Sequence, residues 1–251
     1  MRVKDRVVVV TGGASGIGAA LCRRFAEEEA RGVVVADRNG DGAQALAREI
    51  GGLGVACDVS REAETASGPI DVFFSNAGVA TGGDPLTTPL DEWQRQWDIN
   101  FMAHVYAVRA VLPGMLERGS GYLLHTASMA GILTSQGNAV YASTKHAVVG
   151  FAEWLSITYH HRGIRVSCLA PLGVRTPMLG DPTTVWARTS AGPIKEPDEV
   201  AEMVISAMAE ERFLIVTDPI AQEWMSRKTS DPERWLRGMR RLQVQLEKEG
   251  R

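Results

Sequence analysis

Short apolar runs rich in valine and leucine alternate along this chain with longer stretches whose apolar residues recur at helical spacing. Such short, continuous apolar runs are typical of strands that are buried on both faces of a sheet. Strands that alternate with helical stretches are joined by crossover helices and pair in parallel. The pattern therefore predicts an α/β fold, a doubly wound parallel sheet of about seven strands with helices on both faces.

The strand pattern occurs in seven segments, which are residues 6–11, 33–37, 53–57, 71–75, 121–126, 164–169 and 212–217. Two long helices are predicted at 91–118 and 138–162, and Pro113 is expected to kink or cap the first of them. No repeat or low-complexity linker interrupts the series. We therefore expect one domain over residues 1–251.

Two segments near the end of the chain differ from this alternation. Residues 177–197 contain prolines and glycines around a short helical run, so we expect a mobile lid there. After the last predicted strand, a helical tail is expected at 219–251. In that tail, Asp231 suits an N-cap and Pro232 suits the first residue of a helix.

The composition suits a single domain with a large core, because 45% of the 251 residues are hydrophobic. The formal net charge is -3, and basic residues are spread along the chain, so nothing suggests binding to nucleic acid or to an anionic membrane. A small-molecule partner is expected instead. The first apolar run, at 7–10, is too short for a signal peptide or a membrane span, so we expect a cytoplasmic protein.

Cysteine and histidine residues show no spacing typical of a metal site. Cys22, Cys57 and Cys168 fall inside apolar patterns and have no paired spacing. We therefore expect buried, reduced thiols and no bound metal.

A glycine-rich turn directly follows the first predicted strand, with the sequence Thr-Gly-Gly-Ala-Ser-Gly-Ile-Gly at 11–18, and it opens into a helical pattern. Such a turn presents backbone N–H groups and the positive end of a helix dipole to a pyrophosphate. Gly12 suits the tight turn, Gly16 allows the backbone to approach a phosphate, and Gly18 permits close packing of helix on strand. This arrangement predicts a dinucleotide site in a Rossmann-like sheet.

The residues at the end of the second predicted strand bear on which dinucleotide binds. Asp37 lies about twenty residues beyond the glycines, where a carboxylate can accept hydrogen bonds from a ribose 2′-hydroxyl and would repel a 2′-phosphate. Arg38 favours the opposite, since an arginine can pair with that phosphate. We predict NAD, with NADP as the less favoured cofactor.

Further cofactor contacts are expected where the third and fourth strands end. Asp58 and Val59 are placed to meet an adenine edge through a carboxylate and a backbone N–H. Asn76, Ala77 and Gly78 close the fourth strand at the carboxyl edge, where ligands bind in such sheets. Each group is also typical of ordinary turns.

Tyr141 and Lys145 are four residues apart in a predicted helix, so their side chains share one face. A cation near a phenol favours the phenolate and lowers its pKa from about 10 towards neutrality, which suits proton transfer. Ser128, thirteen residues upstream, would offer a hydroxyl to the same oxygen. Taken alone, the pair is more typical of a solvated contact on a helix surface.

Together these motifs resemble the short-chain dehydrogenase/reductase family, in order over about residues 5–176. The resemblance implies that Tyr141 is the general acid/base, that Lys145 lowers its pKa and holds the nicotinamide ribose, that Ser128 orients the substrate oxygen, and that Asn100 supports a proton relay through water. It also places cofactor contacts along the glycine turn, including Ser15 and Ile17, and in the loop of Pro171, Val174 and Thr176.

The chain departs from the family pattern in three places. Only residues 60–69 separate Asp58 and Val59 from the fourth strand, so the third crossover helix is expected to be shortened to a turn or two. The nicotinamide loop begins Pro171-Leu172-Gly173 instead of Pro-Gly. The last strand lacks a glycine-rich ending and runs on into the tail.

The expected function is hydride transfer between NAD(H) and a hydrophobic secondary alcohol or ketone. Candidate substrate contacts are apolar, and at least half of them also suit lid or core packing; they are Met129, Leu133, Leu172, Met178, Leu179 and Trp186. The two long helices resemble those that pair subunits in the family, so a homodimer or homotetramer is expected. The C-terminal helix could cover a neighbour's pocket or dock on its own subunit.

Two other functions remain open at this point. An NADP-dependent biosynthetic ketoreductase is favoured by Arg38. A non-catalytic NAD-sensing or scaffolding protein would be free to lose the tyrosine or the lysine, and this chain has both.

Overall fold

A single sheet of seven parallel strands organises the computed structural model, which describes residues 1–62 and 69–249. The strands are β1 (Val7–Thr11), β2 (Gly32–Asp37), β3 (Leu53–Ala56), β4 (Val72–Ser75), β5 (Gly121–Thr126), β6 (Ile164–Ala170) and β7 (Leu214–Val216). Their order is β3-β2-β1-β4-β5-β6-β7, with every neighbouring pair parallel. The predicted fold class is confirmed. The order of the strands reverses between β1 and β4, because β2 and β3 are added on one side of β1 and β4 to β7 on the other.

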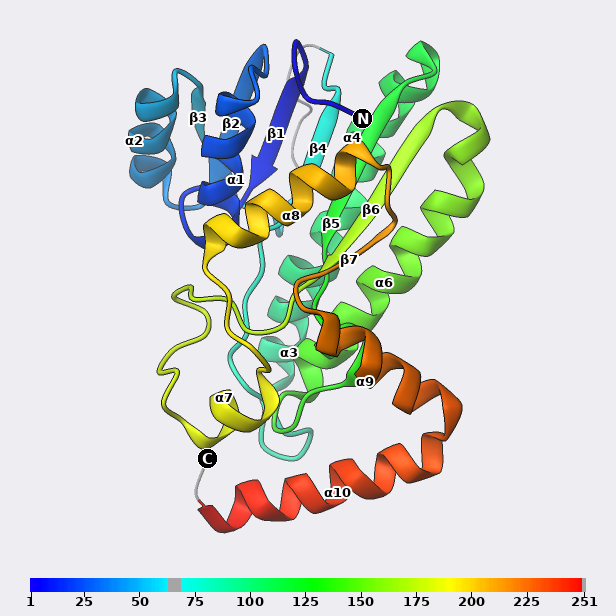
Figure 1. The fold of residues 1–251 in the computed structure, drawn as a ribbon. Helices are drawn as coiled ribbons and strands as arrows, with labels where there is room; N and C mark the ends of the chain where they lie inside the picture. Colours follow the sequence, from blue (N-terminus) through cyan, green and yellow to red (C-terminus); the bar gives the residue numbers. More distant parts are fainter. Residues whose placement is uncertain (63–68, 250–251) are drawn as a thin grey trace.

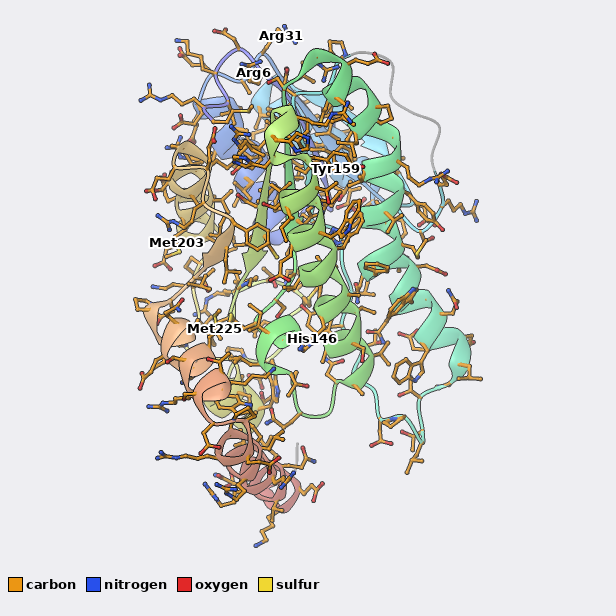
Figure 2. All side chains as sticks on the ribbon, turned by 90° about the vertical axis from the view of Figure 1, so that its right-hand side faces the viewer. Arg6, Arg31, His146, Tyr159, Met203 and Met225 are labelled. Carbon is orange, nitrogen blue, oxygen red and sulfur yellow. The ribbon has the colours of Figure 1, made fainter. Side chains whose placement is uncertain are left out.

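Helices cover both faces of this sheet (Figure 1). They are α1 (Gly16–Glu27), α2 (Gly40–Ile50), α3 (Leu90–Trp97), the π-helix η1 (Asp98–Met102), α4 (Ala103–Arg118), α5 (Ala130–Leu133), α6 (Ala139–Tyr159), the 3₁₀ helix η2 (His160–Arg162), α7 (Val185–Ser190), α8 (Pro197–Ala209), α9 (Pro219–Ser230) and α10 (Pro232–Glu249). Helices α1, α2 and α8 pack into one core cluster and α4 and α6 into another. Figure 2 shows α4 and α6 on one side of the sheet and α8, with Met203, on the other.

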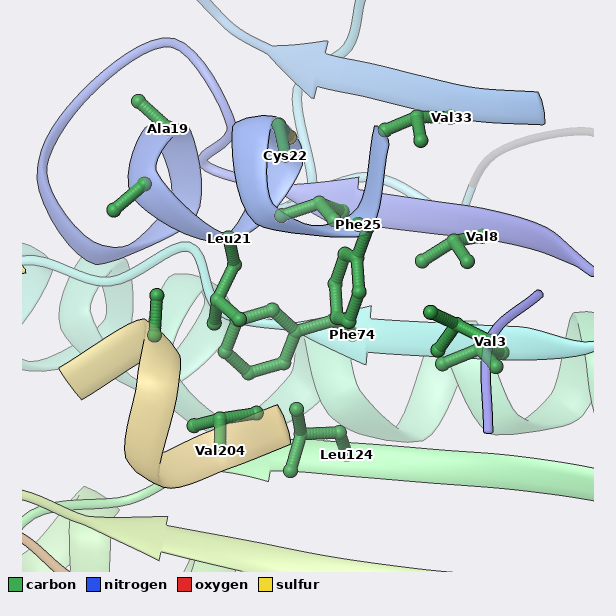
Figure 3. Close-up of a cluster of buried hydrophobic side chains, with 14 of the residues drawn as sticks. Val3, Val8, Ala19, Leu21, Cys22, Phe25, Val33, Phe74, Leu124 and Val204 are labelled. Carbon is green, nitrogen blue, oxygen red and sulfur yellow. The ribbon is translucent and has the colours of Figure 1, made fainter. Parts of the chain in front are cut away.

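Packing in the core explains why the sequences of the strands are almost entirely apolar. Phe25 of α1 and Val204 of α8 pack on the same face as Phe74 and Leu124 of the sheet (Figure 3). All four side chains are fully buried. Burying a large apolar side chain contributes about 1.5 to 3 kcal/mol, so strands covered on both faces retain few polar positions.

The two long helices have nearly the predicted bounds, but their detail differs. The first is a continuous run from α3 through η1 to α4, and Pro113 lies inside α4 without ending it. Pro113 is therefore not a cap. A π-turn at Asp98–Met102 interrupts the regular ladder of this run, and sequence spacing had not indicated it.

Among the described residues there is one helix, Leu90–Arg118, that is long enough and apolar enough to cross a membrane, judged by length and composition alone. A third of its most apolar window is buried. Val108, Leu112 and Met115 of this run pack against the sheet, which accounts for part of its apolar character.

The segment after β3 is only partly described. The predicted shortening of the third crossover helix concerns residues 60–69, and residues 63–68 lie outside the described part of the chain. β7, at three residues, is shorter than the predicted strand at 212–217.

The predicted lid and tail are built as follows. Backbone hydrogen bonds from Gly173 N to Ala191 O (2.7 Å) and from Lys195 N to Gly173 O (3.0 Å) close the base of the lid, which carries α7. Movement of this lid stays a prediction. In the tail, Asp231 Oδ1 accepts a hydrogen bond from Arg234 N (2.9 Å) and α10 starts at Pro232, so the predicted cap is confirmed.

Candidate active site

A cleft of about 790 Å³ opens at the carboxyl ends of the central strands. Of the predicted cofactor and catalytic residues, it is lined by Gly12, Ser15, Gly16, Ile17, Asp37, Arg38, Asp58, Val59, Asn76, Ala77, Gly78, Ser128, Tyr141, Lys145, Pro171, Val174 and Thr176. Gly18 and Asn100 lie behind this lining. The structure thus brings segments from most of the chain to one surface.

The glycine turn forms a shallow cradle with backbone at its surface. Gly12 and Gly16 have φ of +64° and +52°, a region that favours glycine. A Cβ on Gly16 would lie 2.9 Å from the Thr176 side chain, and one on Gly18 would lie 2.2 Å from the carbonyl oxygen of Gly12. Side chains at these positions would fill the space beside the start of α1, so the turn suits a bound pyrophosphate.

Asp37 holds a fixed place at the lip of this cradle. Its Oδ2 accepts a hydrogen bond from Ala14 N (3.0 Å), and its Oδ1 accepts one from Asn39 N (2.9 Å). Negative charge is therefore held where a ribose 2′-hydroxyl is expected. Arg38 lies beside it, exposed and lining the same cleft.

The Asp58 carboxylate is held by its own turn. It accepts hydrogen bonds from Ser60 Oγ (2.7 Å) and Ser60 N (3.1 Å), which lower its pKa. The Asp58 side chain stays exposed at the cleft, so its role towards an adenine remains a prediction.

Asn76 ties three strands together instead of offering its side chain to a ligand. Its Nδ2 donates to Thr11 O (3.1 Å), and its Oδ1 accepts from Thr126 Oγ1 (3.1 Å). Thr11 Oγ1 in turn accepts from the backbone N–H groups of Asn76 (3.0 Å) and Ala77 (3.2 Å). The floor of the cleft is consequently backbone, which permits close approach of a flat ring.

Tyr141 and Lys145 project from α6 towards Ser128 at the end of β5. Lys145 Nζ lies 5.7 Å from the centroid of the Tyr141 ring and donates a hydrogen bond to Thr126 O (2.8 Å). Ser128 forms a hydrogen bond with Tyr141 and also accepts one from Ala130 N (3.1 Å). The phenol, the hydroxyl and the ammonium thus lie at one point of the cleft.

Burial is the largest effect on the pKa values of this group. Burial raises the pKa of Tyr141, and its hydrogen bond with Ser128 is the opposing effect. Burial also lowers the pKa of Lys145 to about 8. The effect of Lys145 on the pKa of Tyr141 stays a prediction. The lysine side chain is itself only 2% exposed, and burial disfavours its charged form.

Asn100 lies in η1, fully buried behind Gly78. Its Oδ1 accepts from Val79 N (2.8 Å), and its Nδ2 donates to Val79 O (2.9 Å) and to Thr144 Oγ1 (3.2 Å). A Cβ on Gly78 would lie 3.4 Å from Asn100 Oδ1 and 3.5 Å from Lys145 Nζ. Asn100 therefore connects the loop after β4 to α6, and the proton relay stays a prediction.

A buried pair of histidines lies on the same side of the sheet as Lys145, and the sequence had not suggested it. His104 Nδ1 and His125 Nδ1 are 2.9 Å apart, and each residue is 1% exposed. Both Nε2 atoms are buried without a partner among the described residues. Burial lowers the pKa of both rings, to about 4 for His125, so both are neutral at pH 7. The register of α4 on β5 creates this pair, which no local motif encodes.

The six predicted substrate contacts all line the cleft. Met129 and Leu133 are also buried in a small core cluster, so they contribute to core packing as well as to the lining of the cleft. Sequence reasoning missed Gln136, Trp224, Trp235, Met239 and Leu242, which line the same cleft. The spacing of apolar residues along α10 was the available signal for the last three.

The three cysteines are all free thiols, but they differ in burial. Cys22, Cys57 and Cys168 are free, and burial raises the thiol pKa of Cys22 and Cys168 to about 12. Cys57 is only partly buried and lines the cleft, so the prediction of burial is wrong for this residue, which follows an edge strand. Among the described residues, no group of three or more His, Cys, Asp or Glu could hold a metal.

Comparisons with known proteins agree with this geometry. A family model described as short chain dehydrogenase matches residues 6–184. The chain is 39% identical over 242 residues to 1-deoxy-11-beta-hydroxypentalenate dehydrogenase of Streptomyces exfoliatus, covering 88% of this chain and 86% of that protein. It is 30% identical over 264 residues to 17-beta-hydroxysteroid dehydrogenase 13 of Rattus norvegicus, covering 98% and 86%. A short chain dehydrogenase/reductase from Burkholderia phymatum in complex with NAD has a similar structure, with a TM-score of 0.84, 26% identity and coverage of 93% and 96%.

The histidine pair predicts a loss of stability in acid. The unfolded chain takes up protons below about pH 6.5, whereas the folded pair stays neutral, so the free energy of unfolding falls as pH falls towards 4, by about 1.4 kcal/mol per pH unit for each histidine. The double variant H104Q/H125Q, which keeps a neutral hydrogen-bonding pair, should show a flatter dependence of unfolding free energy on pH. Urea unfolding at pH 7.5, 6 and 5 measures this.

The control for that measurement is H160Q/H161Q, because these histidines are exposed on η2. This variant should follow the wild type at each pH. An unchanged slope in H104Q/H125Q would contradict the assignment of a neutral buried pair.

Proposed function

This chain belongs to the short-chain dehydrogenase family and is an NAD(P)-dependent oxidoreductase that acts on CH–OH groups, and we propose that it prefers NAD and a hydrophobic secondary alcohol or ketone. The observation that carries the function is the meeting of Tyr141, Ser128 and Lys145 in the cleft that also contains the glycine turn. The apolar contacts around Ser128 support the choice of substrate.

The cleft divides the work between two groups of residues. The glycine turn would hold the pyrophosphate, Asp37 the adenosine ribose and Lys145 the nicotinamide ribose; the nicotinamide, when bound, supplies the site of hydride transfer. Ser128 would orient the substrate oxygen, and Tyr141 would give or take its proton. A positioned proton donor of this kind contributes about 10²- to 10⁴-fold to a rate.

The raised pKa of Tyr141 has a direct consequence for its role. A phenol that keeps its proton at neutral pH is ready to donate it to a ketone oxygen. In the oxidative direction Tyr141 must first lose that proton, which the charged form of Lys145 favours. The charged form of Lys145 predominates below its pKa of about 8.

Replacing Tyr141 tests the assignment of the proton donor. Y141F should lower turnover by at least about 10²-fold, because the phenyl ring has no transferable proton. Its dissociation constant for NADH, measured by fluorescence, should stay within about twofold of the wild-type value. Y159F is the matched control, since Tyr159 lies at the end of the same helix and outside the cleft. Turnover of Y141F close to that of the wild type would contradict the assignment.

The preference for NAD rests on the fixed carboxylate of Asp37. A 2′-phosphate would be placed against this negative charge, and like charges at close range cost several kcal/mol. The similar Burkholderia phymatum protein was solved with NAD. Arg38, exposed beside Asp37, is the observation that favours the second candidate, an NADP-dependent ketoreductase.

Replacing Asp37 distinguishes the two cofactors. D37S should raise kcat/KM with NADP relative to NAD by about 10- to 100-fold, because it removes the repulsion and leaves Arg38 free to pair with the phosphate. D41N controls for loss of a nearby carboxylate, since Asp41 is exposed at the start of α2. Wild-type protein that uses NADP as efficiently as NAD would overturn the preference.

We further propose that the protein forms a homo-oligomer through the outer faces of α4 and α6. A groove of about 630 Å³ between these helices is lined mainly by apolar and aromatic side chains, including Tyr106, Leu116 and Trp154, together with the ion pair of Arg109 and Glu62. Trp154 is 55% exposed, and Ile157 on the same helix is 81% exposed. A tryptophan in such a place is typical of the centre of an interface.

A charge at Trp154 tests this assembly. W154R should convert the oligomer to monomers at micromolar concentration, because it places a charge in an apolar contact. Light scattering after size exclusion measures the mass. L86R, at a side chain 93% exposed and outside the groove, should leave the mass unchanged. A wild-type protein that is monomeric would contradict the proposal.

A further inference from the structure

Helix α10 lies apart from the sheet and crosses below the cleft. It leaves the end of α9, runs along the lower edge of the molecule and ends below α7 (Figure 1). Its packing neighbours are α9 and the lid helix α7. Figure 2 shows the same placement from the side, with α9 and α10 below the layers that enclose the sheet. This helix therefore joins the two sides of the cleft.

One face of α10 is apolar and points into the molecule. Trp235, Met239 and Leu242 line the cleft, and Leu246, one turn further, is 1% exposed. The intervals of four, three and four residues place these side chains on one face of the helix. Leu236, by contrast, is 41% exposed. The apolar face of α10 therefore covers part of the cleft.

The neighbouring wall of this part of the cleft is apolar as well, and Trp235 of α10 packs against the core cluster that contains Met129. This neighbouring wall includes Met129 and Leu172, next to the ends of β5 and β6, and Trp186 and Trp224 from α7 and α9. Met129 directly follows Ser128, so the apolar space extends from the reacting groups to α10. A small alcohol bound beside Tyr141 would leave the α10 side of this space unfilled.

Gln136 is a polar side chain within this apolar surface. It lies in the loop between α5 and α6 and lines the cleft. Thr134, which begins that loop, has φ of +73°, a strained value for a β-branched residue. Gln136 Nε2 lies 3.8 Å from Met239 Sδ, and a thioether is a weak acceptor. Among the described residues, this is the one hydrogen-bond contact of the Gln136 amide.

We propose that α10 forms the outer wall of the substrate pocket and that Gln136 binds a second oxygen of the substrate. The substrate class is then an alcohol or ketone on a large, rigid apolar skeleton, such as fused rings, with a hydroxyl or carbonyl group at the end remote from the reacting carbon. An amide suits this role because it can both donate and accept a hydrogen bond. This inference rests on the proposed hydride transfer.

The wall is tested by two leucines of the same helix. L242A should raise KM for a fused bicyclic alcohol, 2-decalol, by about tenfold, which corresponds to about 1.4 kcal/mol of lost apolar contact. Its KM for cyclohexanol should change less than about twofold, as should its dissociation constant for NADH. L236A, with the same chemical change on the exposed side, should match the wild type for both alcohols. Equal effects of L242A on the two alcohols, or of the two variants on 2-decalol, would overturn the wall.

The role of Gln136 is tested by comparing substrates with one and two oxygens. Q136L keeps the size of the side chain and removes the amide, so kcat/KM for a decalin diol should fall about tenfold, while that for 2-decalol should not fall. Q245L, on the exposed side of α10, is the control. A similar loss for both substrates, or no loss for the diol, would overturn this assignment.

A binding measurement separates this inference from the proposed function. In the Y141F protein with NADH, binding of 2-decalone can be followed by tryptophan fluorescence, since Trp186, Trp224 and Trp235 line the pocket. Binding that is weakened about tenfold by L242A and unaffected by L236A would support the wall even if the wild type turned over none of these alcohols. Absence of such a difference would refute the wall whether or not turnover occurs.

Discussion

The hydrogen bonds that tie the carboxyl ends of β1, β4 and β5 together are the constraint on which the site depends. Asn76 donates to Thr11 and accepts from Thr126, so three strands from distant parts of the chain end in one network. The carbonyl oxygen of Thr126 then accepts the hydrogen bond of Lys145. Backbone of the glycine turn packs on backbone at Ala77, because Gly12 has no side chain. The same network of hydrogen bonds therefore positions both the floor of the cofactor cleft and the proton-transfer residues.

Burial governs the electrostatics built on this floor. Lys145 is a buried cation, and burial lowers its pKa to about 8 against the opposing effect of the Cys168 thiol. The same burial keeps the phenol of Tyr141 and the imidazoles of His104 and His125 neutral. A positive charge on either imidazole would be a second buried cation near Lys145, and burying it would cost further free energy. The two histidines are therefore neutral.

The cleft has two halves with different origins along the chain. Most of the half that suits a dinucleotide comes from the ends of β1 to β4, and the loop after β6 and Lys145 of α6 complete it. The half that suits a substrate comes from the lid and from α9 and α10, which surround Ser128 and Tyr141 with apolar side chains. Backbone amides suit phosphate, a feature common to many ligands, whereas side chains on late helices can vary with the substrate.

The sequence by itself determined the parallel α/β fold, the glycine turn and the shared face of Tyr141 and Lys145, because each depends on spacing within one element. It also identified the cap of α10 at Asp231. Only the tertiary structure decided that burial raises the pKa of Tyr141, that His104 meets His125, and that Trp235 and Leu242 of α10 reach the cleft of their own chain. These features depend on distances between segments far apart in the chain, and on the water excluded when those segments pack, which local patterns do not encode.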